Sequence, residues 1–109
     1  MYKVLPARSF ERDAKVLLKK YVSLREELSK LAKDLALNPT QGTPLGNNCY
    51  KIRQAIKSKG KGKSGGARII TYVITDNEEV ILLAIYDKAE KENLSPGELD
   101  ELLREFNVE

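Results

Sequence analysis

The chain has 109 residues, of which 41% are hydrophobic and 32% charged, a balance typical of one folded domain rather than a disordered chain. Its single cysteine, Cys49, cannot form an internal disulfide, and no apolar run reaches the about 18 residues of a membrane span. Because the N-terminus also lacks the residue order of a signal peptide, we expect one domain over residues 1–109, in the cytoplasm and without a membrane partner.

The net charge of +3 conceals a separation of charge along the chain. Outside residues 35–75 there are 12 basic and all 16 acidic residues, a balance of −4. Inside this stretch there is no acidic residue, and the charge is +7. A stretch of this length without a carboxylate predicts a positive surface for a polyanion such as a nucleic acid. Its basic residues are Lys51, Arg53, Lys57, Lys59, Lys61, Lys63 and Arg68.

The N-terminal part of the chain predicts a short strand and a helical hairpin. Residues 2–5 form the strand candidate, and Ser9 is placed to cap a helix that begins at Phe10. A capping box at residues 23–26 opens a second amphipathic helix, which Pro39 closes. The join between the two helices is so short that they should pack antiparallel.

The rest of the chain predicts three strands and a final helix. Residues 49–56 alternate as a strand, and the apolar runs 67–75 and 79–86 form a hairpin. A glycine-rich loop, 58–66, separates the first strand from the second, and a capping box at residues 95–98 opens the last helix. The order β-α-α-β-β-β-α predicts an α+β fold. We expect a small antiparallel sheet with the helical hairpin on one face and a C-terminal helix, the other face being partly solvated.

Three cations on the solvated face of the predicted sheet form the first candidate site. Lys51 and Arg53 are two residues apart on one strand, and Arg68 begins the next strand. An arginine offers a planar fork of donors and a lysine a compact charge, so together they suit a phosphate. The alternation of Lys51 and Arg53 would also arise if they only solvated the outer face, and the pattern leaves both interpretations open.

The glycine-rich loop is the second candidate. Alternating lysine and glycine would let the backbone follow a chain of phosphates, each contact adding salt-dependent affinity without sequence preference. The alternative is a solvated loop without a role. The predicted RNA contacts are Lys57, Lys59, Lys61 and Lys63.

The third candidate lies where the last predicted strand ends. Tyr86 could stack on a base, and Lys88 could reach the phosphate site. In the alternative interpretation Tyr86 closes the edge of the core and Lys88 pairs with Glu92.

Several kinds of site are excluded. The chain has no histidine, which excludes a histidine acid–base pair and a Cys–His nucleophile at Cys49. The spacing of a nucleotide-binding loop is not met around Gly62-Lys63-Ser64, and no metal-ligand spacing is present. We therefore expect no metal and no cofactor, and any catalysis should come from lysine, arginine and tyrosine.

The segments Tyr50–Arg53 and Gly65–Tyr72, with the basic loop between them, resemble the signature of RelE-type toxins of the RelE/ParE superfamily. The stretch KGKGKSGGARII followed by LLAIYDKAEKENLS is most similar to the ribonuclease branch often labelled HigB. The similarity covers nearly the whole chain. It implies the toxin of a type II toxin–antitoxin system, a metal-independent endoribonuclease that cleaves mRNA on the ribosome and so inhibits translation. It also implies a cognate antitoxin, through which the complex would bind operator DNA.

The resemblance places the catalytic cations at Lys51, Arg53, Arg68 and Lys88. The catalytic tyrosine near the C-terminus of the family has no counterpart, because residues 93–94 are Asn-Leu; Tyr72 or Tyr86 is a candidate to replace it. Attack of a ribose 2′-hydroxyl on the adjacent phosphorus fits these residues, with Arg68 neutralising phosphoryl charge and Lys51 as general base.

Two other functions remain open. A ParE-type gyrase inhibitor would share the fold, but such proteins typically lack the three cations. A nucleic-acid-binding module without catalysis would keep the basic face and would leave the RNA intact.

Overall fold

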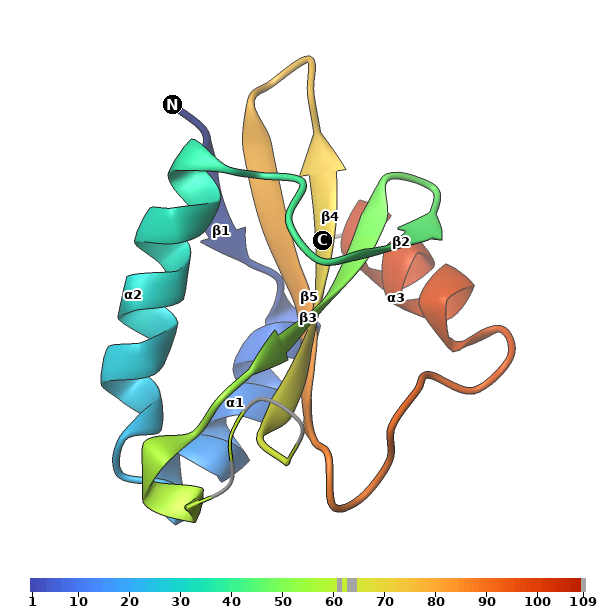
Figure 1. Cartoon of the computed structure of the whole chain (residues 1–109). Coiled ribbons are helices and arrows are strands. Elements are labelled where there is room, and N and C mark those ends of the chain that lie inside the picture. Colours follow the sequence, from blue (N-terminus) through green and yellow to red (C-terminus); the bar gives the residue numbers. More distant parts are fainter. Residues whose placement is uncertain (61, 63–64, 109) are drawn as a thin grey trace.

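The computed structural model describes residues 1–60, 62 and 65–108 as a sheet with helices on both faces (Figure 1). The first two helices lie on one side of the sheet and the last helix on the other. No helix in these ranges is long and apolar enough to cross a membrane. The elements are β1 (Lys3–Pro6), α1 (Arg8–Lys20), α2 (Leu24–Leu37), β2 (Thr43–Gly46), β3 (Cys49–Gln54), the 3-10 turn η1 (Lys57–Lys59), β4 (Ala67–Ile74), β5 (Glu79–Asp87) and α3 (Glu98–Asn107).

The α+β fold is confirmed, but the sheet is mixed and has one strand more than expected. Its order is β1-β5-β4-β3-β2, and β1 runs parallel to β5, with Val4 opposite Val80. The additional strand, β2, pairs with β3 across a tight turn at Asn47 and Asn48, which both have positive φ. Asparagine tolerates this backbone conformation, which a type I′ turn requires at both central residues.

The strand register brings the predicted cations to one face of the sheet. Arg53 of β3 lies opposite Arg68 of β4, which in turn lies opposite Tyr86 of β5. Lys51 lies opposite Ile70 of β4, two residues further along. Residues directly opposite one another share a face, so all of these side chains belong to the same face, as the alternation predicts.

Two apolar cores occupy the two faces. The larger one packs α1 and α2 against the face that carries Ile52, Ile69 and Ile85. The smaller one packs α3 against the cation-bearing face around Ile70 and Leu83. The cation-bearing face is therefore covered in part by α3, while Arg53 of β3 is exposed to solvent.

The helices begin differently from the predicted caps. The Ser9 hydroxyl donates to the Leu83 carbonyl, 2.5 Å away, and α1 begins at Arg8. The Ser23 hydroxyl donates to Glu27, not Glu26, at 3.0 Å. At α3 the Glu98 carboxylate does accept from the backbone of Ser95, but the helix begins at Glu98 and not at Pro96. At Ser9 a tertiary contact with β5 thus takes the side chain that the local pattern assigns to a cap.

Candidate active site

The carboxylate of Glu92 lies at the centre of the predicted cation site. Its Oε2 accepts a hydrogen bond from Arg68 Nε at 2.8 Å, and its Oε1 accepts one from Arg68 Nη2 at 3.3 Å. The Arg68 side chain is only 1% exposed, and its Nη1 also donates to the Ala67 carbonyl. This is the two-pronged pairing that a guanidinium forms with a planar anion. The hydrogen bond from Arg68, aided by nearby cations, lowers the pKa of Glu92.

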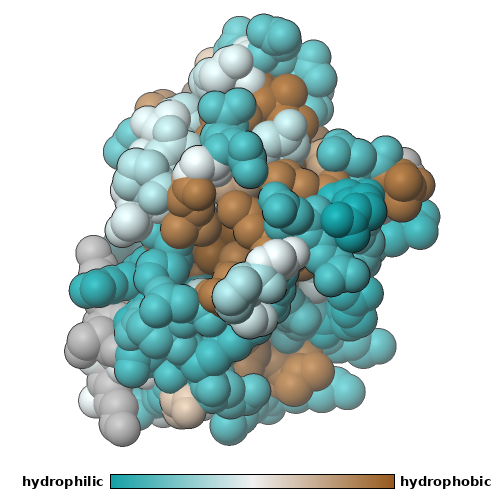
Figure 2. All heavy atoms as spheres, turned by 90° about the vertical axis from the view of Figure 1, so that its right-hand side faces the viewer, coloured by the Kyte–Doolittle hydropathy of each residue, from teal (hydrophilic) through white to brown (hydrophobic). Residues whose placement is uncertain are grey.

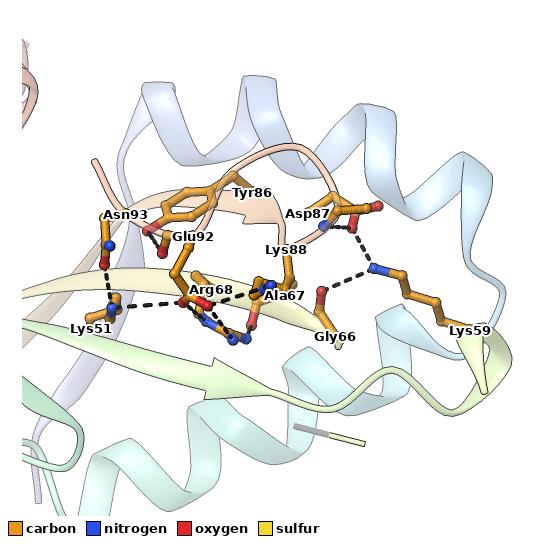
Figure 3. Close-up of polar contacts among 11 residues, drawn as sticks. Lys51, Lys59, Gly66, Ala67, Arg68, Tyr86, Asp87, Lys88, Glu92 and Asn93 are labelled. Atoms are coloured by element: carbon orange, nitrogen blue, oxygen red, sulfur yellow. Dashed lines mark hydrogen bonds and ion pairs between the residues drawn. The ribbon is translucent and has the colours of Figure 1, made fainter. Parts of the chain in front are cut away.

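Two lysines join Arg68 around the same carboxylate (Figure 3). Lys51 Nζ lies 3.9 Å from Glu92 Oε2 and donates to Asn93 Oδ1 at 2.7 Å. Lys88 Nζ lies 3.6 Å from Glu92 Oε1 and precedes Glu92 by four residues in the turn after β5. Lys51, Arg68 and Lys88 are called the cation cluster below. Their donors converge on one anion, which is the arrangement that a phosphate group also requires.

Arg53 stands at the solvent side of the cation cluster. It lies opposite Arg68 in the β3–β4 register, and its side chain is exposed. Of the four predicted catalytic cations, the structure thus brings three to one carboxylate and places the fourth beside them. The solvation interpretation fits Arg53, whereas Lys51 is mostly covered, with 15% of its side chain exposed.

The structure places Tyr86 and Lys88 as the alternative interpretation described. Tyr86 is buried, its hydroxyl donates to the backbone oxygen of Glu92 at 3.3 Å, and the ammonium of Lys91 lies 4.9 Å from its ring centre. Burial, reinforced by the Glu92 carboxylate, raises the pKa of Tyr86. The other candidate, Tyr72, packs edge-on against Phe106 of α3. In this conformation both rings serve the core beneath α3.

Lys59 belongs to a buried polar contact at the end of β5. Its Nζ donates to Asp87 Oδ1 at 2.5 Å and to the Gly66 carbonyl at 3.3 Å. Tyr21 of the α1–α2 hairpin donates to Asp87 Oδ2 at 2.6 Å, and the amide of Ala89 donates to Asp87 Oδ1 at 2.9 Å. Burial alone would raise the pKa of Asp87, but these hydrogen bonds outweigh it and bring the pKa to about 2. Lys59 therefore anchors the basic loop to the sheet.

The loop returns to the sheet at a glycine that the packing requires. A Cβ on Gly66 would lie 2.0 Å from the Gln54 carbonyl, so no other residue fits without moving β3. The Gly66 carbonyl accepts hydrogen bonds from Lys59 Nζ and from the amide of Lys88. One peptide group thus joins the basic loop to the segment that carries Lys88 and Glu92. Of the other predicted loop contacts, Lys57 is exposed, and Lys61 and Lys63 lie outside the described residues.

A pocket of about 230 Å³ adjoins the cation cluster. Lys51, Tyr86 and Asn93 form its wall towards the cluster, and Leu94 and Leu99 contribute apolar surface. Figure 2 shows the α3 side of the molecule, where apolar surface gathers in the middle of a largely hydrophilic face. The pocket combines apolar side chains with a nearby cation, which suits a base that carries a phosphate.

Sequence reasoning missed the anionic member of this site. The sequence pattern indicates Glu92 only as an ion-pair partner for Lys88, and it indicates no role for Asn93. The i, i+4 spacing of Lys88 and Glu92 was the one available signal. Among the described residues, no group of three or more histidine, cysteine, aspartate and glutamate side chains could hold a metal ion.

Comparison with known proteins identifies the fold and the family. A family model described as the RelE toxin of the RelE/RelB toxin–antitoxin system matches residues 2–106. Three solved structures are similar at TM-scores of 0.57, 0.56 and 0.54: a mutant of the Escherichia coli toxin RelE in the free state, the isolated E. coli RelE toxin, and a metal-bound toxin from Helicobacter pylori.

The three proteins resemble this chain in structure more than in amino-acid sequence. The identities are 20%, 21% and 18%, in the same order. The alignments cover 98%, 95% and 84% of this chain and 95%, 98% and 100% of the other chains. At such identities the structures demonstrate a shared fold, and the family match extends over nearly the entire sequence. The chain therefore belongs to the RelE toxin family.

Proposed function

We propose that this protein is the toxin of a type II toxin–antitoxin system and inhibits translation as a metal-independent endoribonuclease that cleaves mRNA, on the ribosome and in the cytoplasm. The observation that carries the proposal is the convergence of Lys51, Arg68 and Lys88 on one carboxylate, within a chain of the RelE family. A site that binds a carboxylate through a guanidinium and two ammonium groups can bind the scissile phosphate in the same place.

In the proposed reaction the ribose 2′-hydroxyl attacks the adjacent phosphorus and leaves a cyclic phosphate and a 5′-hydroxyl. Arg68 neutralises the charge that grows on the phosphoryl oxygens, because its buried fork is already oriented. Lys51 is assigned here to phosphate binding rather than to proton abstraction, since it donates to Asn93 and faces Glu92 as an ammonium. The pocket beside Lys51 offers its apolar wall to the neighbouring base.

The ribosome would orient the RNA and so compensate for a site without a histidine for proton transfer. The chain has no histidine, so proton transfer depends on groups less suited to neutral pH. Effective molarities from orientation alone can contribute about 7–11 kcal/mol to a reaction, and a ribosome-bound message is held in one orientation.

Induction in a bacterial host tests the proposal. Growth should stop, and mapping of 5′ ends should reveal new cuts within translated messages. Growth arrest with intact messages would favour the gyrase-inhibitor alternative. Harmless expression with retained RNA binding would favour the module without catalysis.

The basic loop should contribute salt-dependent binding. Replacing Lys57, Lys61 and Lys63 with serine, with Lys59 left in place to hold Asp87, should weaken binding to single-stranded RNA. The slope of log K against log salt should flatten by about 0.7 for each lost phosphate contact. The control variant replaces Lys15, Lys19 and Lys33, which are exposed on α1 and α2, and changes the charge equally. If both variants show the same slope, the loop acts only through net charge.

We also propose a cognate antitoxin as the partner, with operator DNA bound through the complex. A stretch with seven basic residues and no carboxylate favours an acidic or amphipathic partner segment. Co-expression with a small neighbouring gene should rescue growth and give a complex that co-purifies; a toxic gene without such a neighbour would contradict this proposal.

A further inference from the structure

Glu92 occupies a place that the phosphate-binding function does not explain. It lies on the segment after β5, with 40% of its side chain exposed, and its carboxylate faces Arg68 of β4, Lys51 of β3 and Lys88 of its own segment. An anion at this point would compete with RNA for the same donors. A site that only bound phosphate would do better without it.

The other groups near the cation cluster are poorly placed to accept a proton. The Tyr86 hydroxyl donates to the backbone of Glu92, and burial raises its pKa. Asp87 is 1% exposed and is held by Lys59 and Tyr21. Lys51 is an ammonium that donates to Asn93. Glu92 remains as an ionised base that is exposed to solvent, touches the cations and can leave them by rotating its side chain.

We propose that Glu92 is the general base of the reaction, an inference that rests on the proposed ribonuclease function. The Glu92 carboxylate takes the proton of the ribose 2′-hydroxyl as the 2′-oxygen bonds to phosphorus. The bond from phosphorus to the 5′-oxygen breaks, and that oxygen takes a proton from the Lys51 ammonium. Lys51 then regains a proton from water and Glu92 releases one to water, which restores both groups.

The geometry also explains how the base is activated. In the free protein Arg68, Lys51 and Lys88 are turned towards Glu92, and the hydrogen bond from Arg68 lowers its pKa. When the RNA phosphate takes these donors, Glu92 loses the contacts that lower its pKa and becomes a stronger base next to the reacting centre. The carboxylate is thus held in place by the cation cluster until substrate exchanges with it.

Glu92→Gln tests the inference, because the amide oxygen can still accept from Arg68 while the side chain can no longer take up a proton. Single-turnover cleavage on programmed ribosomes should fall about 100- to 10,000-fold, the usual contribution of a general base. RNA binding should be unchanged or tighter, since the competing charge is gone. Glu90→Gln is the matched control: it removes the same charge from an exposed position two residues away and should cleave like the parent.

The pH dependence separates a base from a simple ion pair. The parent should lose activity as pH falls through the pKa of Glu92. Glu92→Asp should keep this acidic limb at a reduced rate, and Glu92→Gln should lose it. If Glu92→Gln remains folded and cleaves like Glu90→Gln, the base assignment is wrong while the ribonuclease function stands. If the parent itself leaves messages intact, the ribonuclease function fails and the base assignment fails with it.

Discussion

Replacing Arg68 with alanine should abolish growth inhibition and lower cleavage of the message about 100- to 1,000-fold. This is the usual loss when one oriented donor to a transition-state oxyanion is removed. Arg68 is the cation that forms two hydrogen bonds with the Glu92 carboxylate. Because its side chain is nearly fully buried, neither water nor a neighbouring lysine can replace its two donors. The measurement is single-turnover cleavage on programmed ribosomes, together with growth after induction.

Two further variants separate chemistry from folding. Arg68→Lys keeps the charge and the aliphatic stem but loses the planar fork, so it should remain folded and still lose most activity. Arg25→Ala removes an exposed arginine from α2 and should remain as toxic as the parent. A folded Arg68→Lys variant with full toxicity would show that the predicted phosphate site is wrongly assigned.

Replacing Asp87 with asparagine should have the largest effect on stability, lowering the free energy of unfolding by about 3 kcal/mol. Its carboxylate joins Lys59, Tyr21 and the amide of Ala89 in a nearly water-free position. Removing one partner of a buried ion pair leaves the other charge unpaired, which costs about 3–5 kcal/mol. Urea unfolding measures the loss. Asp76→Asn, in the exposed turn between β4 and β5, is the matched control and should unfold like the parent.

The same carboxylate should make stability depend on acid. Its folded pKa of about 2 lies below the ordinary value of 3.8, so the unfolded chain binds the proton more readily. The stabilisation is therefore complete above about pH 5 and is lost as pH falls from about 4 to 2, by about 2 kcal/mol. In Asp87→Asn this part of the pH dependence should be absent. An unchanged acid limb in the variant would show that Asp87 does not carry it.

The sequence was most informative where one strand pattern determines one face. The alternation in residues 49–56 correctly separates Ile52 from Lys51 and Arg53, because side chains on a strand must alternate. The sequence does not reveal that β1 runs parallel to β5, because a short apolar run does not indicate the direction in which a strand pairs. The strand β2 was also not predicted, because its four exposed residues contain a proline and a glycine and lack the alternation of a buried strand.

The carboxylate at the centre of the site, Glu92, was harder to predict than the cations around it. Glu92 meets Arg68 across 24 positions of sequence, and nothing in the run of alternating charges from Lys88 to Glu92 marks one carboxylate as special. Lys59 shares its pattern with its neighbours in the loop, yet it alone of the described loop lysines is anchored to Asp87. Such differences depend on which strand ends meet in space, and local composition does not contain that information.

The proposed ribonuclease activity is tested most directly by incubating the purified protein with ribosomes stalled on a defined message and then analysing the RNA ends. We expect a cut in the message within the ribosome, a cyclic phosphate on the upstream fragment and a 5′-hydroxyl on the downstream one, with Arg68→Lys much slower under the same conditions. A message that stays whole with the parent protein, or one that Arg68→Lys cuts equally fast, would contradict this proposal.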